Sequence, residues 1–221
     1  MTVARPQCET LLTQELNRSS ILGVPYRRTP AVQQRLDAQR DAIAAAAVAL
    51  VAEHGYRGLT IAAVAGRAGV ATGSVYRHFA DKSDLMVQIF RRLCGREVDA
   101  VASAAATGSA VARITAVVET FAFRALRNPV LAYALLAEPV DAAVDVERLV
   151  MRRAFAAAFE GAIRHGIGTG EFPEQDPDLA AAALVGAVGE VLIGPLQSGG
   201  ASAETVPALV ALSLRALGAF P

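Results

Sequence analysis

The chain has 221 residues, of which 53% are hydrophobic and 47 are alanine, with 8 Phe, 4 Tyr and no Trp. Alanine is the best helix former and a poor strand former, so this composition favours an all-α fold and excludes a disordered chain. The 21 Lys and Arg balance the 21 Asp and Glu, but residues 1–96 hold 13 cations against 7 acids and residues 97–221 hold 8 against 14. This division indicates a basic module that meets a polyanion, followed by an acidic module with another task.

The chain shows no sign of a membrane span or a signal peptide. No apolar run reaches about 18 residues without a charge, and the first twenty residues carry four charges. Cys8 and Cys94 lack the spacing of metal ligands, and two thiols do not make a disulfide scaffold. We therefore expect a reduced, soluble, cytoplasmic protein with no metal and no cofactor.

Residues 1–30 precede the first regular pattern. They show no steady period and contain three prolines and the basic pair Arg27-Arg28. We expect a mostly irregular arm over these residues, with a short helix near residues 9–16.

Helical spacing becomes clear from Ala31, and glycines divide the next segment. The first helix ends at Gly55, and the second begins after the N-cap Thr60 and ends at Gly69. The expected inner face of the first is Ile43, Ala47, Leu50, Val51 and His54. The expected inner face of the second is Ile61, Val64, Ala65 and Ala68.

A third short helix is expected at about residues 72–79. Asp81, with Asp84 three residues on, has the pattern of a cap for a longer fourth helix at 81–106. The apolar positions of this fourth helix are Leu85, Met86, Ile89, Phe90 and Leu93.

After Gly108 the breaks are prolines and glycines, and no segment alternates with period two for long enough to predict a strand. Helices are expected at about 109–126, 129–137, 145–167, 177–197 and 203–218. The sequence thus predicts an all-α chain of about nine helices.

The segment from Gly58 to Leu85, GLTIAAVAGRAGVATGSVYRHFADKSDL, is the most informative. Ala65, Gly69 and Val75 have the spacing of a helix-turn-helix. The alanine is small because a second helix crosses it, the glycine suits a turn with positive φ, and the valine packs the second helix on the first. The continuation VYRHFADKSDL makes the pattern much more specific.

Over about residues 36–95 the chain resembles the TetR family of one-component transcriptional regulators. The resemblance rests on EHGYRGLT at the end of the first helix, the helix-turn-helix, YRHF, and the acid-Lys-x-x-L start of the fourth helix. It implies a DNA-binding domain of three helices at residues 31–80. By the family's general plan, it also implies a C-terminal helical domain at 81–221 for ligand binding and dimerisation, to which the helix at 81–106 connects.

The resemblance and the chemistry of the side chains together nominate the DNA-binding residues. They are Thr60, Thr72, Gly73, Ser74, Tyr76, Arg77, His78 and Lys82. Arg77 can make a bidentate contact to guanine, while Thr72 and Ser74 can bond a base or a phosphate. Gly73 has no side chain, so the backbone can approach the DNA closely there.

Tyr76 and Lys82 occupy positions that contact phosphate in the family. Lys82 is the chain's only lysine, and in the first turn of a helix it opposes the helix dipole, so helix stability does not explain it. Thr60 has the alternative of a purely structural N-cap, and His78 that of a packed residue beside Phe79. Ser74 and Arg77 could also be ordinary solvated residues.

The chain departs from the family in two places. Its N-terminal arm is longer, and Arg27, Arg28 and Arg35 could reach DNA, although a solvated tail explains them as well. Where some members carry a base-reading residue, this chain has Ala62, which offers only an apolar contact.

The helices at 177–197 and 203–218 are the candidates for a dimer interface, because the family usually pairs its last two helices with their twofold mates. The apolar positions are Ala181, Leu184, Val185, Val188, Val191, Leu192 and Leu196 in the first, and Leu209, Leu212, Leu214 and Leu217 in the second. The alternative is that both helices are buried within one subunit.

An inducer pocket is expected among the helices at 109–126, 129–137 and 145–167, where the C-terminal aromatics gather. The candidate lining is Phe121, Arg124, Tyr133, Leu136, Met151, Phe155 and Phe159. Arg124, Arg152, Glu138 and Glu160 could orient a polar ligand or could be surface charges. The aromatic side chains could instead fill a core.

The function predicted from the sequence is a ligand-responsive transcriptional regulator. It would act as a repressor that binds a palindromic double-stranded DNA operator as a homodimer and is released by a small-molecule effector. A DNA-binding dimer without a ligand is the alternative. An enzyme is not expected, because the sequence has no nucleophile elbow, P-loop, zincin motif or dinucleotide fingerprint.

Overall fold

The computed structural model describes residues 29–200 and 202–219, which form nine α-helices and no strand. The all-α prediction is confirmed. The expected arm at residues 1–30, its helix near 9–16 and its arginines Arg27 and Arg28 lie outside the described residues, except for the last two positions of the arm. The chain divides into two compact units, residues 1–37 and 38–221. The start of the first helix belongs to the first unit. All contacts described below lie within the second unit, residues 38–221.

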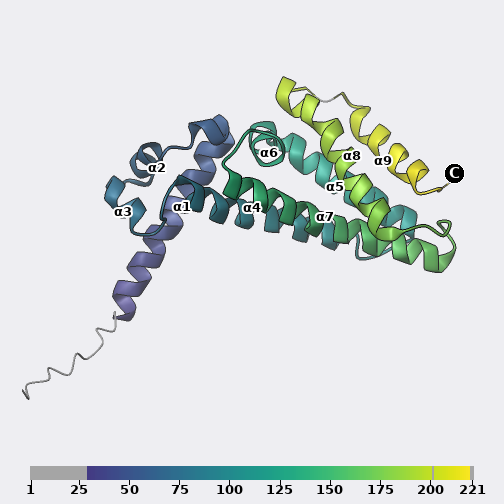
Figure 1. Cartoon of the computed structure of the whole chain (residues 1–221), viewed down its shortest axis with the longest axis horizontal. Helices are drawn as coiled ribbons and strands as arrows, with labels where there is room; N and C mark the ends of the chain where they lie inside the picture. Colours follow the sequence, from purple (N-terminus) through teal and green to yellow (C-terminus); the bar gives the residue numbers. More distant parts are fainter. Residues whose placement is uncertain (1–28, 201, 220–221) are drawn as a thin grey trace, which may run out of the picture. The chain divides into compact units, whose positions relative to one another are not determined.

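The nine helices follow the predicted order (Figure 1). They are α1 (Pro30–Gly58), α2 (Ile61–Ala68), α3 (Thr72–Tyr76), α4 (Lys82–Ala104), α5 (Ala110–Arg127), α6 (Pro129–Leu136), α7 (Ala142–Thr169), α8 (Pro177–Ser198) and α9 (Thr205–Ala216).

The predicted capping residues define the helix-turn-helix. Thr60 accepts a hydrogen bond from the Ala63 amide at 3.1 Å, and Gly69 ends α2 in the left-handed region at φ 66°. Asp81 accepts from the Asp84 amide at 2.8 Å, and the Asp84 carboxylate accepts from the Ala80 amide at 2.9 Å. These two bonds, one to each carboxylate, fix where α4 begins.

Gly55 interrupts α1 as predicted. It adopts φ 68° inside the segment, so the helix kinks there and the backbone turns toward α2. Ile43, Ala47, Leu50 and Val51 are buried as predicted, but His54 is exposed, within 3.6 Å of Glu53, and does not belong to the inner face. Ile61 and Ala68 are only half-buried, so Val64 and Ala65 form the buried face of α2.

The third helix is shorter than predicted. It ends at Tyr76, because the amides of His78 and Phe79 both donate to the Val75 carbonyl and the chain then turns to bury Phe79. Helix α7 is longer than predicted, since it begins after Asp141 and ends at Thr169.

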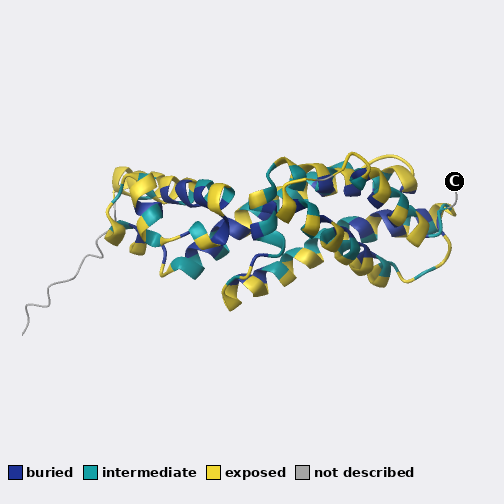
Figure 2. Cartoon of the chain, turned by 90° about the horizontal axis from the view of Figure 1, so that it is seen from above, coloured by how far each residue is buried: buried dark blue, intermediate teal, exposed yellow. Residues whose placement is uncertain are grey.

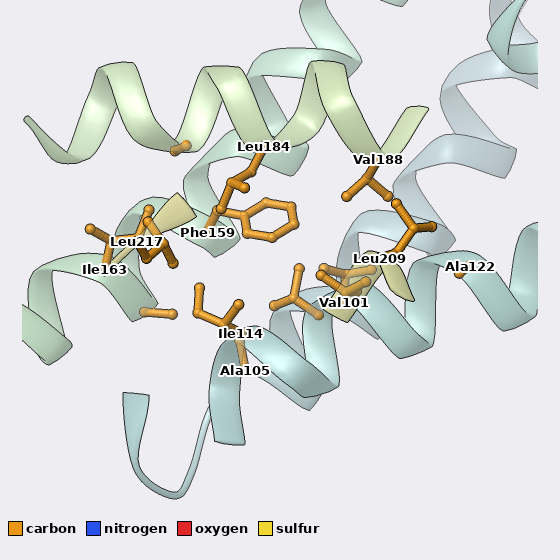
Figure 3. Packing of buried hydrophobic residues seen from close by; sticks show 14 of the residues in the cluster. Val101, Ala105, Ile114, Ala122, Phe159, Ile163, Leu184, Val188, Leu209 and Leu217 are labelled. Atoms are coloured by element: carbon orange, nitrogen blue, oxygen red, sulfur yellow. The ribbon is translucent and has the colours of Figure 1, made fainter. Parts of the chain in front are cut away.

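Helices α4, α5, α7, α8 and α9 pack on one another around an apolar core (Figures 1 and 2). Figure 3 shows Phe159 of α7 among Leu184, Val188 and Ile114, and its exposure is only 4%. A second buried cluster joins α1–α3 to the start of α4 and also takes in Ala134 of α6 and Val144 of α7.

Among the described residues, α8 is long and apolar enough to cross a membrane by length and composition. Core helices of soluble proteins meet the same criterion. Here α8 packs against α5, α6, α7 and α9, and Leu184, Val188 and Leu192 are buried in these contacts.

Candidate nucleic-acid interface and internal cavity

Helix α3 turns one face into the protein and the other to solvent. Val75 is fully buried, whereas Tyr76 is 54% exposed and Thr72, Gly73 and Arg77 are exposed beside it. The buried valine anchors the short helix, so the exposed residues form a surface held by the core. Such a surface suits insertion into the major groove.

Arg77 lies at the C-terminal end of α3. It keeps helical backbone angles (φ −70°, ψ −26°), and its side chain is exposed. The sequence had predicted a helix of about eight residues that presents its N-terminal side chains. In the structure Arg77 follows Tyr76, the last residue of α3. It lies in the turn that is closed by the hydrogen bonds of the next two amides to the Val75 carbonyl.

Thr60 and Ser74 flank this surface. Thr60 is exposed, and since its hydroxyl oxygen accepts the Ala63 amide, its hydroxyl hydrogen stays available to a phosphate. Ser74 is half-buried. Lys82 is also half-buried, and its Nζ lies 3.9 Å from the centre of the Tyr56 ring, a cation–π contact within the protein.

His78 is held against α1. Its Nε2 lies 3.0 Å from Gln39 Oε1, and the residue is half-buried. Nearby, the Arg40 guanidinium lies 5.6 Å from the Phe79 ring centre and donates to Gln88 Oε1. These contacts favour the interpretation of His78 as a packed residue. They also join α1 to the C-terminal end of the exposed face of α3 (Thr72, Gly73, Tyr76 and Arg77), which we call the reading surface.

A cavity of about 230 Å³ lies among α4, α5, α6, α7 and α8. Of the seven residues proposed from the sequence, its wall contains Phe121, Arg124, Leu136, Met151 and Phe155. Tyr133 and Phe159 are not among its lining residues. The Tyr133 hydroxyl instead lies 3.5 Å from Gln197 Nε2, and Phe159 fills the core.

The cavity wall also includes residues that the sequence did not single out as a ligand site. Helix α4 contributes Leu93, Cys94 and Glu97, and α8 contributes Gly186 and Glu190. The helix at 81–106 was interpreted as a connector, and α8 as an interface. A local sequence pattern does not distinguish a residue that lines a cavity from a residue of a connecting helix or of an interface.

Four of the polar wall residues already have partners. The Arg124 guanidinium forms a bidentate pair with Glu97, with Nη2 donating at 2.9 Å, and the Asn128 side chain accepts the Leu131 amide at 3.0 Å. Arg148 donates to the carbonyls of residues 134, 135 and 138 at 2.5–3.0 Å. Among the described residues, Arg152 and Glu190 form no ion pair.

Glu160 and Glu138, proposed as ligand-orienting charges, are engaged elsewhere. Glu160 pairs with Arg164 at 2.8 Å and does not line the cavity. Glu138 is buried and accepts the backbone amides of Tyr56 at 2.6 Å and Arg57 at 3.1 Å. Its carboxylate therefore binds the turn after the α1 kink.

Asp141 makes a second link between the α6–α7 connection and the helix-turn-helix. Its Oδ2 accepts the Ser83 and Tyr56 hydroxyls, each at 2.5 Å. Both hydrogen bonds lower the pKa of the Asp141 carboxyl, and the bond from Ser83 has the larger effect. Burial, together with the adjacent Asp141, raises the pKa of the Tyr56 hydroxyl, so this hydroxyl remains a donor at neutral pH.

Cys94 should be chemically inert in the folded protein. Burial raises the pKa of its thiol to about 12. Since only the thiolate is alkylated, iodoacetamide at pH 8 should react about a thousandfold more slowly than with an ordinary cysteine. In a Cys8→Ser background, mass spectrometry should find Cys94 unlabelled in buffer and labelled in urea. Equal labelling rates in the two conditions would contradict this.

The exposed face of α3 is thus held in place by the capped and buried helix-turn-helix. Residues 43–89 match the family model of the bacterial regulatory proteins of the tetR family. The match confirms the tetR-type helix-turn-helix that the sequence motif predicted for this part of the chain.

Similar proteins include several regulators. A segment of 54 residues is 35% identical to the fatty acid metabolism regulator protein of Bacillus subtilis, and it spans 24% of this chain and 28% of that one. The fatty acid degradation regulator FadR of Bacillus halodurans has the same fold, with a TM-score of 0.67 and 22% identity over 85% of this chain and 96% of that one. FadR of B. subtilis in complex with stearoyl-CoA has a TM-score of 0.66 and 22% identity over 80% of this chain and 95% of that one. A TetR transcription regulator of Haloarcula marismortui has a TM-score of 0.71 and 22% identity over 83% of this chain and 98% of that one. These relatives are named as regulators and not as enzymes.

Proposed function

We propose that the chain is a homodimeric repressor that binds a palindromic operator and is released by a small molecule. The exposed α3 face carries this proposal, because it brings a planar guanidinium and a phenol hydroxyl to one surface of a buried helix-turn-helix. In this account residues 31–80 bind DNA, and residues 81–221 form the dimer and bind the ligand.

The reading surface divides its residues by chemistry. Arg77 reads a guanine through its two parallel donors, and Thr72, Gly73 and Ser74 allow close approach to bases or backbone. Tyr76, Lys82 and Thr60 anchor phosphates, which position the protein without reading sequence. His78 contributes by holding the surface against Gln39.

Of the side chains expected from the sequence at the dimer interface, Val191 and Leu212 are exposed, at 44% and 41%. Ala181, Leu184, Val188, Leu192, Leu196, Leu209 and Leu217 are buried within the chain. The exposed face of α8 is mostly small and apolar but includes the charged Glu190, and it runs through Leu179, Ala182, Ala183, Gly186, Val191 and Gly194. On α9, Leu212 is exposed between Ala208 and Ala216.

Two glycines lie on this exposed face of α8. A Cβ at Gly186 or Gly194 would meet no atom of this chain within 4 Å. Glycine within a helix costs about 0.5–1 kcal/mol relative to alanine, so these glycines do not serve α8 itself. Gly194 leaves room for a twofold mate, whereas the open space beside Gly186 includes the cavity that this residue lines.

Leu212→Asp should weaken the dimer by about 100-fold or more, because twofold symmetry buries the unpaired carboxylate twice. Leu212 is 41% exposed in the single chain, so folding should persist. Leu149→Asp is the matched control, since Leu149 is 52% exposed on α7. Sedimentation velocity at micromolar concentrations should find wild type and L149D dimeric and L212D monomeric. A dimeric L212D protein would contradict the proposed face.

Ligand occupancy would reach the DNA-binding domain through the α6–α7 connection. Arg148 lines the cavity and holds the carbonyls at the end of α6, and the next links are Glu138 with the α1–α2 turn and Asp141 with Ser83. A ligand that displaces Arg148 would loosen these bonds and shift the population away from the DNA-binding state. The cavity supports this function over a ligand-free dimer, whose core would be filled.

Selection of binding sites from a random duplex library tests the proposed function. The account expects an inverted repeat with half-sites separated by about one helical turn or a multiple of it. Unrelated sequences, or single half-sites only, would contradict a dimeric operator-binding regulator.

Lys82→Ala should flatten the salt dependence of operator binding by about two units of log–log slope, since each of two neutralised phosphates contributes about 0.9. Arg96→Ala removes a cation from the exposed surface of the same helix, beyond the reading surface, and is the control. Fluorescence anisotropy between 50 and 300 mM salt, roughly the range in which such slopes are measured, provides the comparison. If the salt slope is unchanged and the free energy of unfolding falls, Lys82 contacts only the Tyr56 ring and no phosphate.

A further inference from the structure

The cavity is small for its position between five helices. It measures about 230 Å³, which is below the range of about 300–1,000 Å³ that is usual for ligand pockets. Its wall is mostly apolar, and the rings of Phe121 and Phe155 meet there edge to face at 5.1 Å and 84°. A ligand body that fills it must therefore be compact and apolar.

The charges on the wall do not balance. Arg124, Arg148 and Arg152 face two carboxylates, those of Glu97 and Glu190, which leaves one net positive charge. Arg124 and Glu97 neutralise each other in a bidentate pair, and Arg148 is occupied by backbone carbonyls and by an ion pair with Asp145 at 3.5 Å. Among the described residues, Arg152 is the wall arginine without an ion pair.

Arg152 also lies one helical turn from Arg148 on α7. Burial lowers the pKa of the Arg148 guanidinium, the Asp145 carboxylate 3.5 Å away raises it, and the charge of Arg152 lowers it. Arg148 therefore has its own counter-charge, and an anion in the cavity would make its charge-assisted hydrogen bonds with Arg152.

We propose that the ligand of this cavity is a compact monoanionic amphiphile, with an apolar body against Phe121 and Phe155 and a carboxylate on Arg152. This inference rests on the proposed function and adds the ligand class. The same dimensions disfavour a long acyl chain, since the cavity is smaller than most pockets for drug-sized ligands. Glu190 disfavours a polyanionic carrier, which would bring several negative charges to a wall with one net positive charge.

Isothermal titration of the free protein tests the ligand class with octanoate, 1-octanol and stearoyl-CoA as probes. Octanoate should bind more tightly than 1-octanol, its neutral counterpart, and stearoyl-CoA should bind least. Arg152→Gln should weaken octanoate binding by about 10- to 100-fold and leave 1-octanol binding unchanged. Arg153→Gln is the matched control, because Arg152 and the adjacent Arg153 are both exposed but only Arg152 lines the cavity.

Equal binding of octanoate and 1-octanol, an R152Q protein with unchanged octanoate affinity, tighter binding of stearoyl-CoA, or no binding of any probe would each overturn the ligand class. These measurements contain no DNA. A failure here therefore leaves the operator-binding function standing, whereas that function fails separately if site selection returns no inverted repeat.

Discussion

Arg77→Ala should weaken binding to the selected operator by about 30- to 10⁴-fold. Each bidentate arginine–guanine contact contributes about 1–3 kcal/mol, and a dimer makes two such contacts, one in each half-site. The side chain is exposed, so the free energy of unfolding should stay within about 0.5 kcal/mol of wild type. Anisotropy titration against the operator and a scrambled duplex measures the change.

Arg77→Lys is the matched control for this prediction. Lysine keeps the positive charge but lacks the planar fork that matches guanine O6 and N7. It should restore binding to the scrambled duplex while leaving most of the operator preference lost. If Arg77→Ala weakens operator and scrambled duplexes equally, Arg77 is a phosphate anchor and the assignment of the reading residue is wrong.

Gly55→Ala should destabilise the fold by about 2–5 kcal/mol. A non-glycine residue at φ 68° costs about 1–2 kcal/mol, and the new Cβ would meet Glu138 Oε2 at 2.6 Å. Moving Glu138 away leaves the buried amide of Tyr56 unpaired, at a further cost of about 1–3 kcal/mol. Urea unfolding at equal protein concentration should show a lower midpoint with an unchanged slope.

Gly66→Ala is the control for the backbone change. Gly66 lies in α2, and a Cβ there would meet nothing within 4 Å, so alanine should be neutral or stabilise by up to about 1 kcal/mol. Gly55→Ala should also weaken operator binding, because the turn that Glu138 holds leads into α2. A G55A protein as stable as G66A would mean that the contact of Glu138 with this turn does not determine the stability of the domain.

Local chemistry explains why so much of the DNA-binding domain could be predicted. Thr60 and Asp81 accept amides three residues on, and Gly69 donates its own amide to carbonyls of the preceding turn, so their spacing predicted the bounds of α2 and the start of α4. The length of α3 could not be predicted in this way. It is set by the burial of Phe79, which depends on helices distant in sequence.

The C-terminal domain depends on contacts that a sequence pattern does not contain. Helix α8 is apolar on nearly all sides, so periodicity could not separate the face buried within the chain from the exposed face with Gly186. Glu138 looked like a possible ligand contact because its partners, the amides of Tyr56 and Arg57, lie 82 and 81 residues away. Cavity residues of α4, such as Cys94, were missed for the same reason.

The affinity ratio of wild-type dimer for the selected inverted repeat against a scrambled duplex, at fixed physiological salt, tests the central claim most directly. The account predicts a preference of at least about 10³-fold, which falls steeply when one half-site is scrambled. Equal affinity for the inverted repeat, the single half-site and the scrambled duplex would contradict it, because α3 would then bind DNA by charge alone.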